Sequence, residues 1–102
     1  EPEFVRMIED GMDRGTLDAV LRLYRSAPED ELARAGRDLA SLTCPALVVW
    51  PDRDRYIGPE FGPAYAAALP DAELLEVPGV GHWPWRERPW LIDRMIEFLE
   101  SD

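Results

Sequence analysis

ALVVWPDRD, residues 46–54, joins an uninterrupted apolar run to a loop of aspartate and arginine. The run has the length of a strand, and its lack of polar alternation is typical of a strand buried on both faces. We therefore predict a strand at about residues 45–50, inside a sheet with neighbours on both sides of it.

The sequence that follows this strand alternates helix and strand signals. Apolar side chains at helical spacing predict a helix at about residues 61–69, and ELLEV predicts a second strand at about 73–77. An amphipathic helix from Leu91 to Leu99 follows. Two strands joined through a helix run parallel with a right-handed crossover. Residues 43–102 therefore predict a β-α-β-α unit of the α/β class.

The sequence before the strand predicts helices over about residues 3–39. Two apolar stripes at helical spacing occur there, with Thr16 a candidate N-cap for the second helix. Pro28, followed by three acidic residues, predicts the start of a third helix that runs to about Leu39. We expect the stripes to be core faces, and they carry no pattern typical of chemistry. The predicted division is a helical segment over 1–42 and an α/β portion over 43–102.

Composition excludes several classes of function. The 21 acidic and 11 basic residues give a net charge of −10, so nucleic acid and anionic membranes are not expected partners. No apolar run approaches a membrane span, and EPEFVRMIED is no signal peptide, which leaves a cytoplasmic location as the expectation. The single cysteine, Cys44, excludes an internal disulfide and is expected to be buried at the strand entry. With one cysteine and one histidine, no metal site is expected.

Two chemically useful side chains follow the two predicted strands. Asp52 and Asp54 come after the first strand, and His82, the only histidine, comes after the second. Parallel strands end at the same edge of a sheet, so a carboxylate and the imidazole should meet there. A carboxylate beside histidine holds one imidazole tautomer, and the other ring nitrogen is then free to take a proton.

CPALVVWPDRD, then LPDAELLEVPGVGHWPWRERP, then the last amphipathic helix resemble the C-terminal third of an α/β-hydrolase, over about residues 43–100. The resemblance implies an incomplete α/β-hydrolase fold, with Asp54 as the catalytic acid and His82 as the base. The first forty residues could be lid helices and the helix leading into the sheet. Pro51 stands where the family usually has glycine, which keeps Asp52 as a weaker candidate for the acid. Glu87 and Pro89 match the E-x-P motif that often follows the histidine in this family, and the two are expected to position the last helix.

The chain lacks the G-x-S-x-G elbow that carries the nucleophile in this family. We therefore expect the nucleophile and the oxyanion hole to lie outside this chain, and the chain alone to be inactive. A serine nucleophile would imply ester, lactone or amide substrates, and an aspartate would imply epoxides or haloalkanes. Ester or lactone hydrolysis of a small molecule is favoured, without metal or organic cofactor. The partner would be the N-terminal remainder, or a second chain, that completes the sheet.

Other interpretations stay open beside this one. The chain could be a non-catalytic module that binds a partner, or itself, through an unpaired sheet edge. Trp83 could contact substrate, although Trp83, Trp85 and Trp90 also suit a core or a pocket wall. Tyr56 could line the entrance of the site or simply pack.

Overall fold

A computed structural model describes residues 2–101. The chain divides into two compact units, one ending at Gly36 and one beginning at Arg37, and each is described by itself. The division predicted at residues 42 and 43 separates lid helices from the α/β portion, and it stays a prediction.

The first unit holds α1 (Pro2–Gly11), α2 (Arg14–Arg25) and most of α3 (Glu29–Asp38). Asp13 precedes α2 in an extended conformation, and its carboxylate accepts a hydrogen bond of 2.7 Å from the backbone N–H of Thr16. The prediction of Thr16 as N-cap is therefore wrong. Thr16 is the third residue of the helix and donates one of the N–H groups that a cap must satisfy.

The expectation that the N-terminal stripes form core faces is also wrong for the described chain. Helices α1, α2 and α3 contain no buried residue, and Met7, for example, is 59% exposed. The helices do have the amphipathic pattern. An amphipathic helix buries its stripe only when another apolar surface covers it, and within the described part of the first unit no element covers these stripes.

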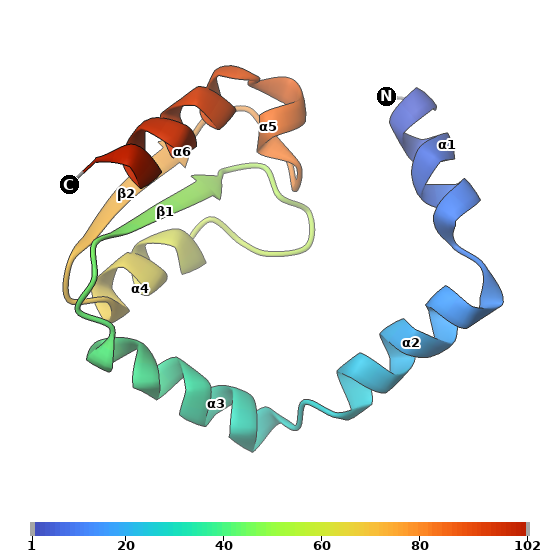
Figure 1. The fold of residues 1–102 in the computed structure, drawn as a ribbon, viewed down its shortest axis with the longest axis horizontal. Coiled ribbons are helices and arrows are strands. Elements are labelled where there is room, and N and C mark those ends of the chain that lie inside the picture. Colours follow the sequence, from blue (N-terminus) through green and yellow to red (C-terminus); the bar gives the residue numbers. More distant parts are fainter. Residues whose placement is uncertain (1, 102) are drawn as a thin grey trace. The chain divides into compact units, whose positions relative to one another are not determined.

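The second unit is the predicted β-α-β-α arrangement. Its elements in chain order are β1 (Ala46–Pro51), α4 (Phe61–Ala68), β2 (Ala72–Val77), α5 (Pro84–Glu87) and α6 (Trp90–Glu100). The two strands lie parallel, with Ala46 opposite Ala72 and Pro51 opposite Val77, and their arrowheads point the same way in Figure 1. This confirms the α/β class and the incomplete α/β arrangement. Both strands lie within one residue of their predicted bounds.

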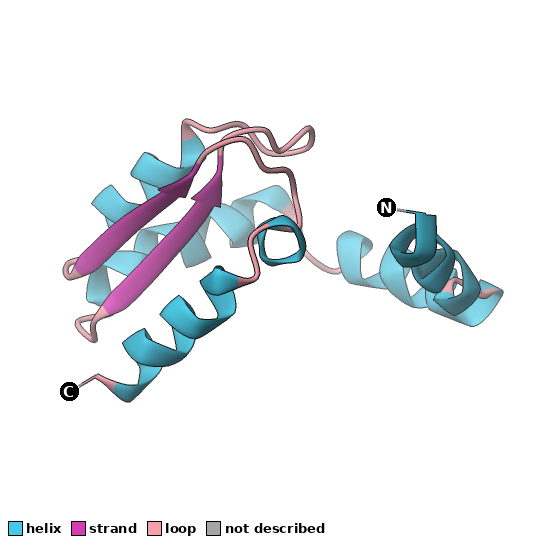
Figure 2. Ribbon diagram, turned by 90° about the horizontal axis from the view of Figure 1, so that it is seen from above, coloured by secondary structure: helices cyan, strands magenta, loops and turns pink. Residues whose placement is uncertain are grey.

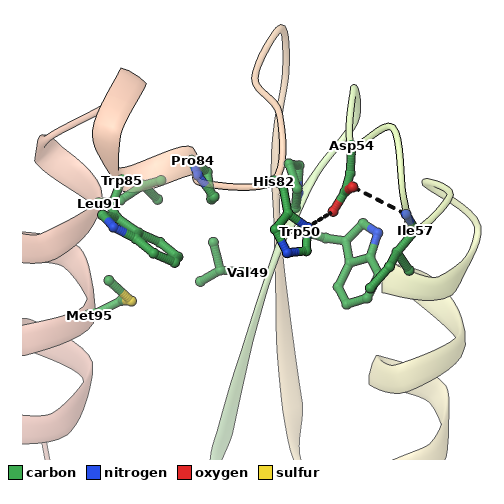
Figure 3. Close-up of a pocket in the computed structure, with 10 residues that line it drawn as sticks. Val49, Trp50, Asp54, Ile57, His82, Pro84, Trp85, Leu91 and Met95 are labelled. Carbon is green, nitrogen blue, oxygen red and sulfur yellow. Dashed lines mark hydrogen bonds and ion pairs between the residues drawn. The ribbon is translucent and has the colours of Figure 1, made fainter. Parts of the chain in front are cut away.

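Helices α4 and α6 cover opposite faces of the sheet (Figures 2 and 3). On the α4 face, the Trp50 ring lies 5.6 Å from the Tyr65 ring, and its Nε1 donates a 3.0 Å hydrogen bond to the carbonyl of Gly58. On the α6 face lies the buried core, which consists of Val77, Val80 and Leu91, with the partly buried Val49 and Leu75 against it.

One edge of β1 is unpaired within residues 2–101. Ala46 N–H donates to Asp71 and Asp52 N–H donates to Val77, so the even-numbered residues of β1 direct their peptide groups toward β2. Among the odd-numbered residues, the peptide N–H and C=O groups of Leu47 and Val49 and the C=O group of Pro51 face the other edge of β1. Pro51 can therefore lack an N–H without losing a bond to β2. Because of this open edge, residues 46–50 are only partly buried, although helices cover both faces.

Cys44 is exposed, so the expectation of a buried cysteine is wrong. It precedes the first residue of β1 by two positions and so lies outside the strand.

Candidate active site

The loops after β1 and β2 meet at the carboxyl edge of the sheet. Asp54 lies on the first loop and His82 on the second, and Oδ2 of Asp54 is 2.6 Å from Nδ1 of His82 (Figure 3). Figure 3 draws the imidazole over the end of β1, beside the Asp54 carboxylate. The structure therefore brings together the two side chains that the topology of the sequence places at one edge.

The second oxygen of Asp54 is held by the backbone. Oδ1 accepts hydrogen bonds from the N–H groups of Tyr56, at 2.7 Å, and Ile57, at 3.2 Å, as in an Asx-turn. Burial raises the pKa of Asp54, whose side chain is 5% exposed, but the hydrogen bonds from His82 and from these N–H groups outweigh it and lower that pKa. The carboxylate is thus ionised at neutral pH.

The ionised carboxylate fixes the state of the imidazole. A carboxylate can only accept, so Nδ1 of His82 is the donor in the 2.6 Å contact. In the neutral ring, Nε2 is then the acceptor nitrogen, and it has no hydrogen-bond partner among residues 2–101. The His82 side chain is 34% exposed, so this nitrogen is available to a reacting group.

Asp52 does not take the place beside the imidazole. Its Oδ1 accepts a 2.6 Å hydrogen bond from the backbone N–H of Gly79, on the loop that precedes His82. Of the two aspartates on the first loop, Asp54 is therefore the partner of the histidine.

Aromatic rings surround the imidazole. The Tyr56 ring contacts it edge-on at 5.3 Å between centroids, and the Trp83 ring does so at 4.8 Å. Trp83 in turn contacts Trp85 at 5.8 Å. Tyr56 and Trp83 are both exposed, so a molecule that reaches the imidazole would meet them. Trp90, at 49% exposure, begins α6 and belongs neither to the core nor to the pocket wall.

A mostly apolar pocket of about 200 Å³ adjoins Asp54 and His82. It is lined by Val49, Trp50, Pro51, Asp54, Ile57, His82, Pro84, Trp85, Leu91 and Met95 (Figure 3). Within the described residues, no group of three or more histidine, cysteine, aspartate or glutamate side chains is arranged to hold a metal ion. The ionisable side chains among the lining residues are the Asp54 carboxylate and the His82 imidazole, a pair that suits proton transfer.

The short helix α5 and the contact that it makes were not predicted from the sequence. Oε2 of Glu87, at the end of α5, accepts a 2.9 Å hydrogen bond from the backbone N–H of Gly81. The contact acts on the loop before His82, whereas the expectation from the motif was an action on the last helix. Four residues are too few for a periodic pattern, so Pro84 at the helix start was the only available signal.

In the part of the chain that the structure describes, no helix has the length and apolar character needed to cross a membrane.

Comparisons with known proteins relate the chain to hydrolases. Over 65 residues the chain is 32% identical to a 2-hydroxy-6-oxononadienedioate/2-hydroxy-6-oxononatrienedioate hydrolase of Cupriavidus pinatubonensis (strain JMP 134 / LMG 1197). The match takes in 63% of this chain but only 22% of that hydrolase. No solved structure gives a significant match. The profile of the alpha/beta hydrolase family matches residues 2–91, which includes the N-terminal helices as well as both strands and His82. The chain therefore belongs to the alpha/beta hydrolase family.

Proposed function

We propose that this chain supplies the acid, Asp54, and the general base, His82, of a nucleophile–acid–histidine triad whose nucleophile lies outside the chain. The observation that supports this most directly is the 2.6 Å contact between Oδ2 of Asp54 and Nδ1 of His82. It leaves Nε2 as the acceptor nitrogen beside an apolar pocket. Membership of a hydrolase family supports the reaction type.

The chemistry of the pair follows from its hydrogen bonds. Nε2 of His82 would take a proton from a serine hydroxyl or from water, and the ionised Asp54 would stabilise the imidazolium that forms. With a serine nucleophile, Nε2 then gives the proton to the leaving group, and a water that it deprotonates releases the acyl group. With an aspartate nucleophile, the alkyl ester intermediate is hydrolysed by such a water.

The identity of the nucleophile decides the substrate class. We favour esters or lactones, with epoxides and haloalkanes as the alternative if the nucleophile is aspartate. The substrate that the relative's name gives, 2-hydroxy-6-oxononadienedioate, belongs in the same assays. We place Trp83 and Tyr56 against the substrate because both rings contact the imidazole and are exposed. The proposed enzyme is cytoplasmic and uses no metal or organic cofactor.

A non-catalytic binding module is the second candidate function. The observation that favours it is the unpaired edge of β1 at Leu47 and Val49, which could accept a strand from a partner or from a second copy. The N-terminal remainder of a hydrolase would use the same edge to complete the sheet.

The polypeptide isolated from its source separates the two functions. A segment of 65 residues makes up 22% of the relative, so the proposal expects a polypeptide of about 300 residues. It should contain G-x-S-x-G, or its counterpart with aspartate, before residue 1 of this chain. A mature product without such a motif would favour the binding module.

In that polypeptide, His82→Ala should lower kcat by about 10⁴- to 10⁶-fold, as loss of the base does in other triads. Asp93→Asn, at an exposed position of α6, is the control and should leave kcat unchanged. Full activity in His82→Ala would exclude His82 as the base.

A further inference from the structure

Three hydrogen bonds hold the main chain of the loop between β2 and His82, two to side-chain carboxylates and one to another backbone group. The N–H of Gly79 donates to Oδ1 of Asp52 at 2.6 Å, and the N–H of Gly81 donates to Oε2 of Glu87 at 2.9 Å. Between them, the carbonyl of Val80 accepts from the N–H of Arg53 at 3.0 Å. The Val80 side chain, 1% exposed, packs in the core. Each of the three residues that precede the imidazole is therefore anchored.

The two carboxylates come from different elements. Asp52 lies on the loop after β1, and Glu87 lies at the end of α5, whose first residue, Pro84, is buried. Backbone N–H groups bonded to carboxylates form charge-assisted hydrogen bonds, which are stronger than neutral ones. Gly79 has a φ of +75°, a conformation that costs glycine little, so the chain can turn here and still direct its N–H at Asp52.

We infer that Asp52 and Glu87 are positioning residues that fix the backbone of residues 79–81 and thereby set where the His82 imidazole lies relative to Asp54. Neither carboxylate is hydrogen-bonded to the imidazole, so both act through the main chain. The inference rests on the proposed function only in taking His82 as the base; the geometry that it concerns can be measured without turnover.

The expected effect is a loss of catalytic geometry rather than of substrate affinity. A base displaced by about 1 Å can cost about 10²-fold in rate. Asp52→Ala and Glu87→Ala should each lower kcat of the complete enzyme by about 10- to 100-fold, with KM changed less than about threefold. Asp52→Asn and Glu87→Gln keep a carbonyl oxygen that accepts from the same N–H, so they should recover most of the rate.

The direct readout uses the full 102-residue chain, in which His82 is the only imidazole. With ¹⁵N-labelled histidine, the ring shifts report the tautomer that Asp54 holds, and hydrogen exchange reports the protection of the Gly79 and Gly81 amides. The alanine variants should lose protection at their own amide and show a mixture of tautomers. The amide-bearing variants should keep the original signals. Glu97→Ala, at an exposed position of α6, is the control.

Alanine variants that keep the single tautomer and a kcat within twofold of the parent would overturn the inference. So would failure of both Asn and Gln variants to recover the rate, since charge rather than the backbone contact would then matter. If an alanine variant does not fold by circular dichroism, the Asn and Gln variants still decide the question. If His82→Ala is fully active, the proposed function fails, while the tautomer and exchange data still test the positioning.

Discussion

Asp54 uses both of its carboxylate oxygens, one on the imidazole and one on two backbone N–H groups. Rotation of the carboxylate would break all three hydrogen bonds, so the side chain is held in one orientation. The three hydrogen bonds stabilise the charged form of this partly buried carboxylate and outweigh the cost of its desolvation. The local Asx-turn therefore presents the second oxygen to His82 in a fixed place.

Asp54→Asn removes the negative charge of this side chain and replaces one of its two acceptor oxygens with an NH₂ donor. The amide oxygen can still accept from Tyr56, but the NH₂ group would then face Nδ1 of His82 and favour the tautomer with the proton on Nε2. In the complete enzyme we expect kcat to fall by about 10⁴-fold, as for the same change in another triad. The ¹⁵N shifts of His82 in the chain should show the change of tautomer. An unchanged tautomer would contradict this account of Asp54.

The lowered pKa of Asp54 predicts acid sensitivity with a definite sign. A carboxyl whose folded pKa lies below its unfolded value of about 3.9 stabilises the fold fully above that value, and loses this contribution as the pH falls through the folded pKa. The free energy of unfolding should therefore differ more between parent and Asp54→Asn at about pH 5 than at about pH 2.5. Urea titrations at both pH values measure this, with Asp93→Asn as control. An equal difference at the two values would rule out the lowered pKa.

The choice between Asp52 and Asp54 shows what the sequence can specify at a single residue. Topology alone predicts that a carboxylate from the first loop meets His82, since both strands end at one edge. Which aspartate does so depends on the turn from Asp54 to Ile57 and on the bond from Gly79 to Asp52. These are hydrogen bonds from backbone N–H groups to the two carboxylates, and no periodic pattern in the sequence records them.

Among the elements, α4 approaches β1 closely at Gly62. A Cβ placed on Gly62 would lie 2.6 Å from Cγ and 2.8 Å from Cβ of Trp50. Gly62 is buried, and Trp50 is held by the Tyr65 ring and by the Gly58 carbonyl. The glycine is therefore required by the close approach of helix and strand.

Gly62→Ala should destabilise the second unit by about 1–3 kcal/mol, because the added methyl group forces Trp50 to move. Gly36→Ala is the matched control, since it also lies in a helix but its Cβ would meet nothing within 4 Å. That change should be neutral or stabilising by up to about 1 kcal/mol. Urea unfolding followed by circular dichroism, which reports on the helices of both units, measures both. Equal stabilities of the two variants would contradict the close packing of α4 on β1.

Elements with a long, strong pattern were predicted well, and short or locally capped ones were not. The apolar run of β1 and the stripe of α6 are set by burial over several residues, which the sequence records. Helix α5 has four residues, and the start of α2 depends on which of Asp13 and Thr16 accepts the hydrogen bond. Whether an apolar stripe is covered depends on a partner surface, which the stripe itself does not encode.

At the scale of the whole molecule, residues 2–101 leave apolar helix faces exposed in the first unit and main-chain N–H and C=O groups unpaired along one edge of β1 in the second. The first unit buries no residue of its helices, and β1 has one paired edge. A two-stranded sheet with an open edge is marginal in water and tends to pair with another strand. The proposed base, His82, and its carboxylate, Asp54, line a pocket that Val49 and Pro51 of β1 also line. We therefore expect a strand that pairs with the open edge of β1 to complete the proposed catalytic centre as well.

The chain of 102 residues, expressed alone, should show no specific hydrolysis. A base without a positioned nucleophile or oxyanion donors lacks the largest contributions to acyl transfer, and loss of one oxyanion donor alone costs about 10²- to 10³-fold. Activated esters, epoxides and the relative's substrate should give no saturable turnover above His82→Ala. Sedimentation should show association that rises with concentration, through the edge at Leu47 and Val49. Turnover that saturates and disappears in His82→Ala would mean that the chain holds its own nucleophile. If both proteins are inactive, activity that returns on addition of the N-terminal remainder, and only with His82 present, would support the division of the triad between the two polypeptides.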